Sequence, residues 1–269
     1  MQSLAETIED RMDPMLKGIL HEAGLLAEAM GFGAYAVGGT VRDLLLGRDN
    51  VDLDIVVEGE GIRFAGRLAG RLRARVKGYE RFGTATISLT GGIKVDVATA
   101  RTEIYEAPAA LPRVTPGSIR EDLARRDFTI NAMAASLAPA AFGRLLDEFG
   151  GVRDIREGSI RVLHGRSYID DPTRIFRAVR FETRLGFRIV ADDEARIAEA
   201  LTLGLLETLE EYRIAAELRL ILREADCARA VQRLSQLGVL DALEGLRRDR
   251  RSLGRPLAKI GQILAAARR

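Results

Sequence analysis

The feature that most constrains the fold is a change of hydrophobic spacing partway along the chain. Up to about residue 100, short apolar runs are separated by glycine turns such as Thr90-Gly-Gly92. After about residue 140, apolar residues recur at i, i+3 and i+4 almost throughout, which is typical of amphipathic helices. The first pattern predicts a mixed sheet with hairpins at one side, and the second predicts helices. We therefore expect an α/β unit followed by an all-α unit.

Gly150 and Gly151 mark a hinge between these two units. The sequence predicts three segments: an N-terminal helical segment (1–32), an α/β domain (33–150) and a helical domain (151–269). The expected strands are 34–37, 51–57, 75–79, 84–90 and 93–99, and the early helices are 12–31, 40–46 and 60–73. The later helices are 170–185, 191–206, 212–223 and 227–237. Between the halves, the proline-containing stretch from Arg101 to Pro116 predicts a long loop, and such loops are often functional.

The composition is that of a globular protein with an ample core, at 269 residues with 47% apolar and 30% charged residues. No run of 18 uncharged apolar residues occurs, so no membrane contact is expected. The single cysteine, Cys227, argues against disulfides and favours a reducing cytoplasm. Nearly all of the 41 basic residues are arginine, which suits phosphate binding or reflects coding bias. The basic segment from Arg247 to Arg269 is either a nucleic-acid contact or a frayed tail.

Two aspartates one residue apart, Asp52 and Asp54, follow a glycine turn and a short predicted helix. On a strand, positions i and i+2 point to the same side, so the two carboxylates share a face while Leu53 and Ile55 pack behind them. Two carboxylates held this close repel unless a cation lies between them, and oxygen ligands favour Mg²⁺. The pair is either a magnesium site or a solvated strand end.

Gly38 and Gly39 precede the predicted helix at 40–46. Backbone N–H groups at the start of such a helix form a binding site for phosphate. Arg42, in the first turn, is placed to reach the same anion. The alternative is a simple tight turn. Together with the aspartate pair, this arrangement predicts a site for a nucleoside triphosphate and a metal.

A third aspartate, Asp96, lies mid-strand among apolar neighbours, so we expect it to be buried and to need a partner. It either completes the metal site or faces solvent on an edge strand. Further on, Arg126, Asp127 and Asn131 lie close together in the sequence. Asp127 and Asn131 have the groups to bond sugar hydroxyls, and Arg126 suits a phosphate; a helix-capping network is the alternative.

A helix is predicted to begin with Asp171 at its N-cap and Pro172 at its first position. Arg174, Arg177 and Arg180 recur at i, i+3 and i+6 along it. This arginine stripe is either a solvated face or, aimed into a cleft, a surface for phosphates or base edges.

Four segments in this order resemble the class II tRNA nucleotidyltransferases and bacterial poly(A) polymerases of the polymerase-β-type superfamily. The resemblance covers about residues 33–220 and rests on Gly38–Asp43 with Asp52-Leu-Asp54, Arg125–Ala132, Asp170–Arg174 with Arg177 and Arg180, and Tyr212–Glu217. It implies a nucleotidyltransferase head with a mixed sheet and helices, followed by a helical neck and body. It also implies a template-free enzyme that adds nucleotides to an RNA 3′ end from ATP, or from ATP and CTP, and releases pyrophosphate.

The resemblance also implies roles for the candidate residues. Asp52 and Asp54 would hold two Mg²⁺ ions, with Asp96 as a further catalytic carboxylate. The nucleotide would be bound by Gly38, Gly39, Arg42, Arg126, Asp127, Asn131, Asp171, Arg174, Arg177 and Arg180. Within that set, Asp171 and Arg174 match the residues that read the base edge, because a carboxylate accepts from an exocyclic amine and a guanidinium donates to a ring acceptor. Asp170 stands where the family usually has glutamate, which keeps the charge and shortens the reach.

The choice of nucleotide is less constrained. The segment 105–116 resembles the A-adding and poly(A) branch, so we expect addition of A or CCA to tRNA 3′ ends, with poly(A) polymerase activity on another RNA 3′ end as the alternative. That branch often carries the head within a longer chain, so this chain is compatible with being a fragment. A non-catalytic RNA- or nucleotide-binding module has no need of the aspartate pair. A small-molecule nucleotidyltransferase fits the arginine-rich half less well than one with a polyanionic acceptor.

Overall fold

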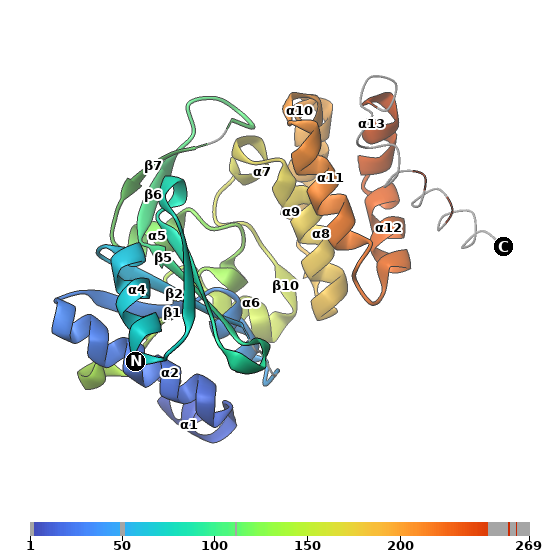
Figure 1. The fold of residues 1–269 in the computed structure, drawn as a ribbon. Helices are drawn as coiled ribbons and strands as arrows, with labels where there is room; N and C mark the ends of the chain where they lie inside the picture. Colours follow the sequence, from blue (N-terminus) through green and yellow to red (C-terminus); the bar gives the residue numbers. More distant parts are fainter. Residues whose placement is uncertain (1–2, 49–51, 111, 247–257, 259–261, 263–269) are drawn as a thin grey trace. The chain divides into compact units, whose positions relative to one another are not determined.

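The computed structural model describes residues 3–48, 52–110 and 112–246, together with residues 258 and 262 (Figure 1). Its contacts divide the chain into a first unit, Met1–Glu103 with Val114–Ile155, and a second unit, Ile104–Arg113 with Arg156–Arg269. The N-terminal helices, which the sequence sets apart as residues 1–32, pack into the first unit. The segment 104–113 goes with the helical unit. The basic segment that begins at Arg247 lies outside the described residues, apart from positions 258 and 262.

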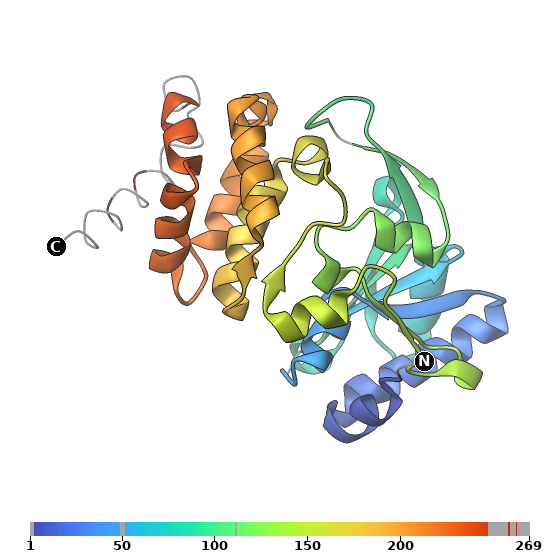
Figure 2. The same ribbon diagram turned by 180° about the vertical axis from the view of Figure 1, so that it is seen from behind.

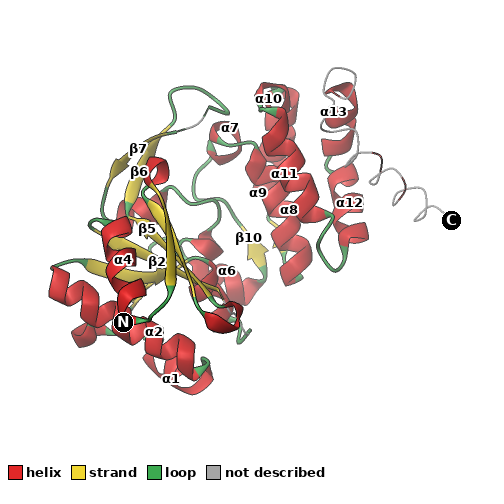
Figure 3. Ribbon diagram, in the orientation of Figure 1, coloured by secondary structure: helices red, strands yellow, loops and turns green. Residues whose placement is uncertain are grey.

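Among the described residues, a mixed sheet of seven strands forms the centre of the first unit, in the order β3-β4-β5-β2-β1-β8-β9. Figure 3 draws the strands in yellow. β2 and β5 pair in parallel, whereas β3, β4 and β5 are joined as antiparallel hairpins at one side of the sheet, as the sequence predicts. The strands are β1 (Gly33–Val37), β2 (Asp52–Glu58), β3 (Arg75–Tyr79), β4 (Thr84–Ser88), β5 (Lys94–Thr99), β8 (Ala134–Ser136) and β9 (Leu145–Leu146).

One face of this sheet carries the main hydrophobic core of the unit. Leu20 of α2 and Phe64 and Leu68 of α4 are fully buried in it, together with the core-facing residues of β2 and β5. α2 begins where the Asp13 carboxylate accepts from the N–H of Met15, 2.8 Å away, so its start is capped. The helices of this unit are α1 (Ala5–Arg11), α2 (Pro14–Met30), α3 (Gly39–Leu45), α4 (Gly61–Arg71), α5 (Ile119–Ala124) and the first residues of α6 (Gly151–Glu157), with 3₁₀ turns at Glu80–Phe82, Thr90–Gly92, Thr129–Asn131 and Pro139–Ala141.

The other face of the sheet is covered only in part. Ile119 and Leu123 of α5 pack on Val37 and Val56, at the end of β2 that is farther from Asp52. Along β2 the two faces separate cleanly, since Leu53 and Ile55 are each 1% exposed while Asp52 is exposed. The sheet face that bears the aspartates is therefore apolar under α5 and polar beyond it.

The predicted long loop at 101–116 instead contains two short strands, β6 (Arg101–Ile104) and β7 (Arg113–Pro116), which form a separate two-stranded sheet. The hydroxyls of Thr102 and Thr115 lie 2.6 Å apart across it. All residues of β7 are exposed, so neither strand shows the alternation of apolar and polar residues that marks a half-buried strand. The loop prediction was wrong for this reason.

The second unit is built mainly from helices that lie side by side in both views (Figures 1 and 2). They are α7 (Ser167–Asp170), α8 (Thr173–Leu185), α9 (Ala191–Thr202), α10 (Leu205–Thr208), α11 (Glu211–Ile221), α12 (Cys227–Gln236) and α13 (Val239–Leu246), with the short parallel strands β10 (Ser159–Ile160) and β11 (Arg188–Ile189). The predicted helix at 191–206 is split, because Gly204 adopts a left-handed φ of 67° between α9 and α10. No helix in the described part of the chain has both the length and the apolar character needed to cross a membrane.

Candidate active site

The aspartates that the sequence singles out lie on the part of the sheet face that α5 leaves uncovered. Asp52 and Asp54 project from β2 on the side opposite Leu53 and Ile55, as predicted from strand alternation. The backbone N–H of Asp54 donates to the hydroxyl of Thr40, 2.9 Å away. This bond ties the strand to the first turn of α3, so the carboxylates and the glycine turn belong to one local structure.

Asp96 joins this pair, although its surroundings differ from those expected. β5 is an interior strand rather than an edge, and Asp96 lies directly opposite Asp54 in the parallel register. The expectation that Asp96 is buried was wrong: Val95 and Val97 alternate with it toward the core, which leaves its carboxylate exposed. The hydroxyl of Thr86 on β4 donates to it across 2.5 Å.

The electrostatics of the site centre on Asp54. Burial raises the pKa of the Asp54 carboxyl to about 6, against a lowering effect of the Arg126 guanidinium. The neighbouring carboxylates of Asp96 and Asp52 raise it further, and Arg42 lowers it. A raised pKa means that negative charge accumulates here at a cost, which a bound cation would relieve.

A cavity of about 350 Å³ opens beside these carboxylates. Asp54 and Asp96 line it from the sheet, with Thr84 and Thr86 of β4 on one side and Arg126 on another. Carboxylates and a guanidinium therefore face the same space. This combination suits a ligand that carries both a metal ion and phosphate groups.

Gly38 is required by its backbone conformation and by a close neighbour, whereas Gly39 has room for a methyl group. Gly38 has φ 59° and ψ −121°, a conformation that residues with a side chain rarely adopt. A methyl group added there would lie 2.8 Å from Nη1 of Arg126, and one added at Gly39 would lie 3.6 Å from Oδ2 of Asp54. The glycine turn thus brings bare backbone between the arginine and the carboxylate.

A chain of hydrogen bonds links α3 to the segment after Arg126. Arg42, which is 6% exposed, donates from Nη1 to Oδ1 of Asn131 over 2.7 Å, while its other nitrogens bond the carboxylate of Asp43. The amide nitrogen of Asn131 donates in turn to Oδ1 of Asp127, 3.0 Å away. Arg42, Asp127 and Asn131 are therefore held together as one polar layer beside the glycine turn.

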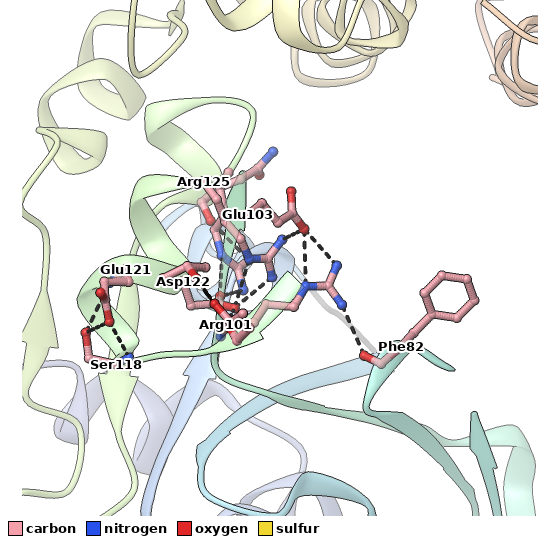
Figure 4. A network of polar contacts seen from close by, with 11 residues as sticks. Phe82, Arg101, Glu103, Ser118, Glu121, Asp122 and Arg125 are labelled. Carbon is pink, nitrogen blue, oxygen red and sulfur yellow. Dashed lines mark hydrogen bonds and ion pairs between the residues drawn. The ribbon is translucent and has the colours of Figure 1, made fainter. Parts of the chain in front are cut away.

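Arg126 is oriented by a carboxylate that the sequence did not single out, that of Asp122. Figure 4 shows Asp122 with its other partner, Arg125. Asp122 on α5 has no exposed side-chain surface and accepts from Arg126 through Oδ2, at 2.9 and 3.2 Å, and from Arg125 through Oδ1, at 2.7 and 3.1 Å. Arg125 also bonds Glu103, as does Arg101. Because the buried carboxylate of Asp122 accepts hydrogen bonds from both arginines, the guanidinium of Arg126 is fixed at the edge of the cavity.

The residues present fit a magnesium ion. Within the described residues, no group of three or more His, Cys, Asp or Glu side chains is placed to hold a metal by itself. Mg²⁺ is usually bound in enzymes through one or two carboxylates, with substrate phosphates and water as the other ligands. Asp52 and Asp54 supply such oxygens, and burial, which raises the pKa of Asp54, disfavours a carboxylate charge that a cation would stabilise.

In the second unit, Asp171 lies at the start of α8. Its Oδ1 accepts from the N–H of Thr173 at 3.1 Å, the bond expected of an N-cap, although the helix begins at Thr173 rather than Pro172. The same oxygen accepts from Nη2 of Arg213, 2.8 Å away on α11. Arg174, 5% exposed, donates to the hydroxyl of Ser167 over 2.5 Å. Both predicted base-reading residues are thus held by neighbouring helices.

The three arginines of α8 do not form one exposed stripe. Arg174 and Arg180 are buried, and only Arg177 is partly exposed, with its guanidinium 5.6 Å from the ring centre of Phe181. Burial lowers the pKa of Arg180, and the Glu217 carboxylate on α11 raises it. Arg177 lies between Arg174 and Arg180 around the helix, so the difference in exposure reflects the elements that pack on α8 and not the spacing itself. The solvated-face alternative was therefore wrong for Arg174 and Arg180.

The predicted site residues thus fall into two sets. The structure brings one set together in the first unit, and the other lies at α7 and α8 of the second unit. The first set is Gly38, Gly39, Arg42, Asp52, Asp54, Asp96, Arg126, Asp127 and Asn131; the second is Asp171, Arg174, Arg177 and Arg180.

Sequence reasoning missed the residues that position these groups. Asp122 was detectable, because an acid three and four residues before two arginines has the spacing of ion pairs on a helix. Thr40 and Thr86 had no such signal, since their partners Asp54 and Asp96 are distant in sequence. Arg213 lies within a segment that the sequence singled out, but its bond to Asp171 joins two helices and leaves no local pattern.

Comparison with known proteins identifies relatives for both units. Residues 34–161 match the Poly A polymerase head domain family. An A-adding tRNA nucleotidyltransferase of Geobacter sulfurreducens is 50% identical over 222 residues, which cover 82% of this chain and 25% of the relative. Another, of Halalkalibacterium halodurans, is 42% identical over 231 residues, which cover 85% of this chain and 54% of the relative. The chain therefore spans a quarter to about half of the length of these relatives.

Solved structures resemble the chain over both units. A CCA-adding enzyme in its apo form II aligns with a TM-score of 0.86 and 43% identity, covering 90% of this chain and 57% of that one. A Thermotoga maritima CCA-adding enzyme complexed with tRNA aligns with a TM-score of 0.80 and 41% identity, covering 90% of this chain and 55% of that one. With the glycine turn, the carboxylates and the helical unit in the places that the sequence motifs indicated, the chain belongs to the family of tRNA nucleotidyltransferases and poly(A) polymerases.

Proposed function

We propose that the chain carries the active site of a template-independent nucleotidyltransferase that adds A to the 3′ end of tRNA. ATP is the nucleotide substrate, and two Mg²⁺ ions are held by Asp52 and Asp54. No part of this activity requires a membrane, and the cytoplasmic location expected from the sequence stays a prediction.

The observation that carries the proposal is the meeting of two carboxylates with Arg126 at one cavity, with a third carboxylate on the same face of β2. Asp54 and Asp96 line that cavity, Asp52 lies two residues along the same strand face, and the guanidinium of Arg126 is beside them. A module that only binds RNA or nucleotides has no use for carboxylates whose charge is costly to keep, as the raised pKa of Asp54 indicates. Transfer of a nucleotidyl group needs this combination.

The reaction follows from what each group can do. The oxygen of the RNA 3′-hydroxyl attacks the α-phosphorus of ATP, the bond to the bridging oxygen breaks, and pyrophosphate leaves with the electron pair. Asp96, held at Oδ1 by Thr86, accepts the hydroxyl proton. Arg126 and Arg42, with the backbone at Gly38 and Gly39, bind the triphosphate. When bound, Mg²⁺ lowers the pKa of the attacking hydroxyl and neutralises charge on the leaving group.

The sugar and the base are bound by separate groups in this proposal. Asp127 and Asn131, held together over 3.0 Å, contact the ribose hydroxyls. Asp171 and Arg174 read the base edge, and adenine offers them an amine next to a ring acceptor. Arg177 and Arg180 add positive charge on the same helix. The fixed positions of Asp171 and Arg174 support this role, because a rigid pair of groups can discriminate between bases.

The relatives support addition of A, with addition of CCA as the second candidate. Relatives named A-adding are 50%, 49% and 42% identical to this chain, compared with 37% for one named CC-adding and 33% for one named CCA-adding. The second candidate is supported by solved structures of CCA-adding enzymes with ATP and with CTP, each 41% identical. An enzyme that adds CCA uses CTP as well as ATP.

The experiment that tests the proposal combines three tRNAs with four nucleotides. The tRNAs end at the discriminator base, at C and at CC, and each is incubated with Mg²⁺ and one nucleoside triphosphate. A-adding activity predicts one added A on the CC end alone. Addition of C to the shorter ends would show CC- or CCA-adding activity, long A tracts on any end would show poly(A) activity, and no extension with any nucleotide would refute the proposal.

A further inference from the structure

The sheet face that bears the carboxylates continues past them to the edge strand β3. We propose that this continuation binds the single-stranded 3′ segment of the RNA acceptor, and the inference rests on the proposed function. We call it the acceptor face and define it by the side chains of Arg75, Lys77, Tyr79 and Lys94.

Strand register places a cation in line with the central carboxylates. Lys77 on β3 pairs with Thr86 on β4, Thr86 pairs with Asp96 on β5, and Asp96 pairs with Asp54 on β2. Paired residues in neighbouring strands point to the same face, and strands lie about 4.8 Å apart. Lys77 therefore lies three strands away, about 14 Å from Asp54, on the face where the acceptor hydroxyl must arrive.

A second row of paired residues crosses the same four strands, beside the row from Lys77 to Asp54. Arg75 pairs with Ser88, Ser88 with Lys94, and Lys94 with Asp52. Arg75 and Lys94 are exposed, as is Ser88 between them. Two rows thus carry positive charge from the strand edge toward the negative carboxylates, which is the distribution that a polyanionic strand ending at a metal site requires.

An exposed aromatic ring accompanies these cations. Tyr79 is 41% exposed, and Nζ of Lys77 lies 5.2 Å from the centre of its ring. Tyr79 pairs with Thr84, which lines the cavity of Asp54 and Asp96. Proteins that bind single-stranded RNA combine a basic track with aromatic rings on which bases stack. The acceptor face has both features and joins the cavity directly.

On β4 and β5 the opposite face serves the core, whereas β3 is exposed on both faces. Ile87 and Val95, which alternate with Thr86, Ser88 and Asp96, have no exposed surface. Edge strands also carry lysine to prevent pairing with other sheets, and β3 is an edge strand. That role would account for Lys77 and Arg75 on β3, but not for Lys94 on the interior strand β5.

The test measures RNA binding separately from catalysis. A labelled RNA oligonucleotide that ends in CC with a 3′-deoxy terminus cannot be extended, and fluorescence anisotropy reports its affinity for the full chain. Lys77→Glu and Tyr79→Ala are each predicted to weaken binding about tenfold. Arg67→Ala is the matched control, because Arg67 is an exposed basic residue on α4, the helix that packs against the other face of the sheet.

Three further measurements accompany the binding assay: its salt dependence, the KM for ATP and thermal unfolding. The salt dependence of binding is expected to become shallower in Lys77→Glu, with a change of about 0.7 in slope for each phosphate that the protein no longer neutralises. The KM for ATP should not change, and thermal unfolding should show that the variants fold. Unchanged RNA affinity in both variants would overturn the inference. Self-association of Lys77→Glu with intact RNA binding would also overturn it, because Lys77 would then serve only to prevent β3 from pairing with another sheet. Failure of the wild-type chain to extend tRNA would instead refute the proposed function.

Discussion

On strand β2, Asp52 and Asp54 lie on a face that ligands can approach, whereas on helix α8 Arg174 and Arg180 are buried and held by neighbouring helices. Both sets were recognisable as regularly spaced charges. The spacing of a strand returns every second side chain to one face, while a spacing of three rotates around a helix. The two aspartates therefore share one face, whereas Arg174 and Arg180 each depend on a different neighbouring helix, through Ser167 and Glu217.

The largest effect on nucleotide transfer is expected from substitution of an aspartate on β2. Asp52→Ala should lower nucleotide transfer to tRNA by at least about 1,000-fold, because it removes a metal-binding carboxylate that supports the reaction by several kcal/mol. Asp52 is exposed, so the circular dichroism spectrum should be unchanged. Asp10→Asn, at an exposed acid on α1, is the matched control and should keep full activity. Transfer at the normal rate in Asp52→Ala would remove the proposed metal site.

On the helix side, Arg174→Ala should relax the choice of base more than it weakens ATP binding. Removal of one hydrogen-bonding group at the base edge is expected to reduce discrimination between ATP and the other nucleotides by about 2 kcal/mol, or roughly thirtyfold. The measurement is the ratio of kcat/KM values for the four nucleotides. Arg184→Ala, on the same helix and paired with Glu224, should keep the ratio. A variant that lacks Arg174 and remains selective would refute base reading by this residue.

The Asp54 carboxylate should reduce the stability of the folded protein at neutral pH. Since the folded state raises the Asp54 pKa from 3.8 to about 6, it binds a proton more tightly than the unfolded state does. In EDTA, the wild-type protein should therefore lose on the order of 2 kcal/mol of stability as the pH rises through this window, and the loss should persist above it. Asp54→Asn should remove the loss.

Thermal unfolding against pH measures this effect. The two proteins should have similar Tm values below about pH 4, and Asp54→Asn should be the more stable above about pH 6. Added Mg²⁺ should raise the Tm of the wild type and have little effect on the variant. A variant that is less stable than the wild type at neutral pH would show that the Asp54 carboxylate supports the fold.

The smallest effect on catalysis is expected from Arg213, which holds Asp171 at the start of α8. Arg213→Ala removes the bond from Nη2 to Asp171, while Thr173 still donates to the same oxygen. We expect the KM for ATP to rise about fivefold, which corresponds to about 1 kcal/mol, with little change in kcat. Arg219→Ala, an exposed position on the same helix, is the control. Equal kinetics in the two variants would mean that Arg213 has only a structural role.

Much of the first unit was predictable from the sequence, because its decisive features are local. Alternation along β2 placed Asp52 and Asp54 on one face, and the glycine pair placed a turn beside them. Features that depend on register between distant segments were not predictable. The bond between Asp96 and Thr86 follows from the pairing of β5 with β4, which leaves no local signal.

The helical unit was harder to predict for a related reason. Its helices were recognised from their spacing, but the burial of Arg180 depends on which helix packs against α8. The strands β6 and β7 were missed because exposed residues carry no alternation. Hydrophobic patterns thus identified the elements, whereas the partners of charged residues required the packing of one element on another.

The central claim is that the carboxylates on β2 and β5 catalyse extension of an RNA 3′ end. The most direct measurement is the transfer of labelled AMP from ATP to a tRNA that ends in CC, with the wild type and Asp54→Asn side by side and with Mg²⁺ present or withheld. The account predicts one added nucleotide, only with the wild type and only with Mg²⁺. Equal extension by Asp54→Asn, or extension by the wild type without a divalent metal, would contradict it.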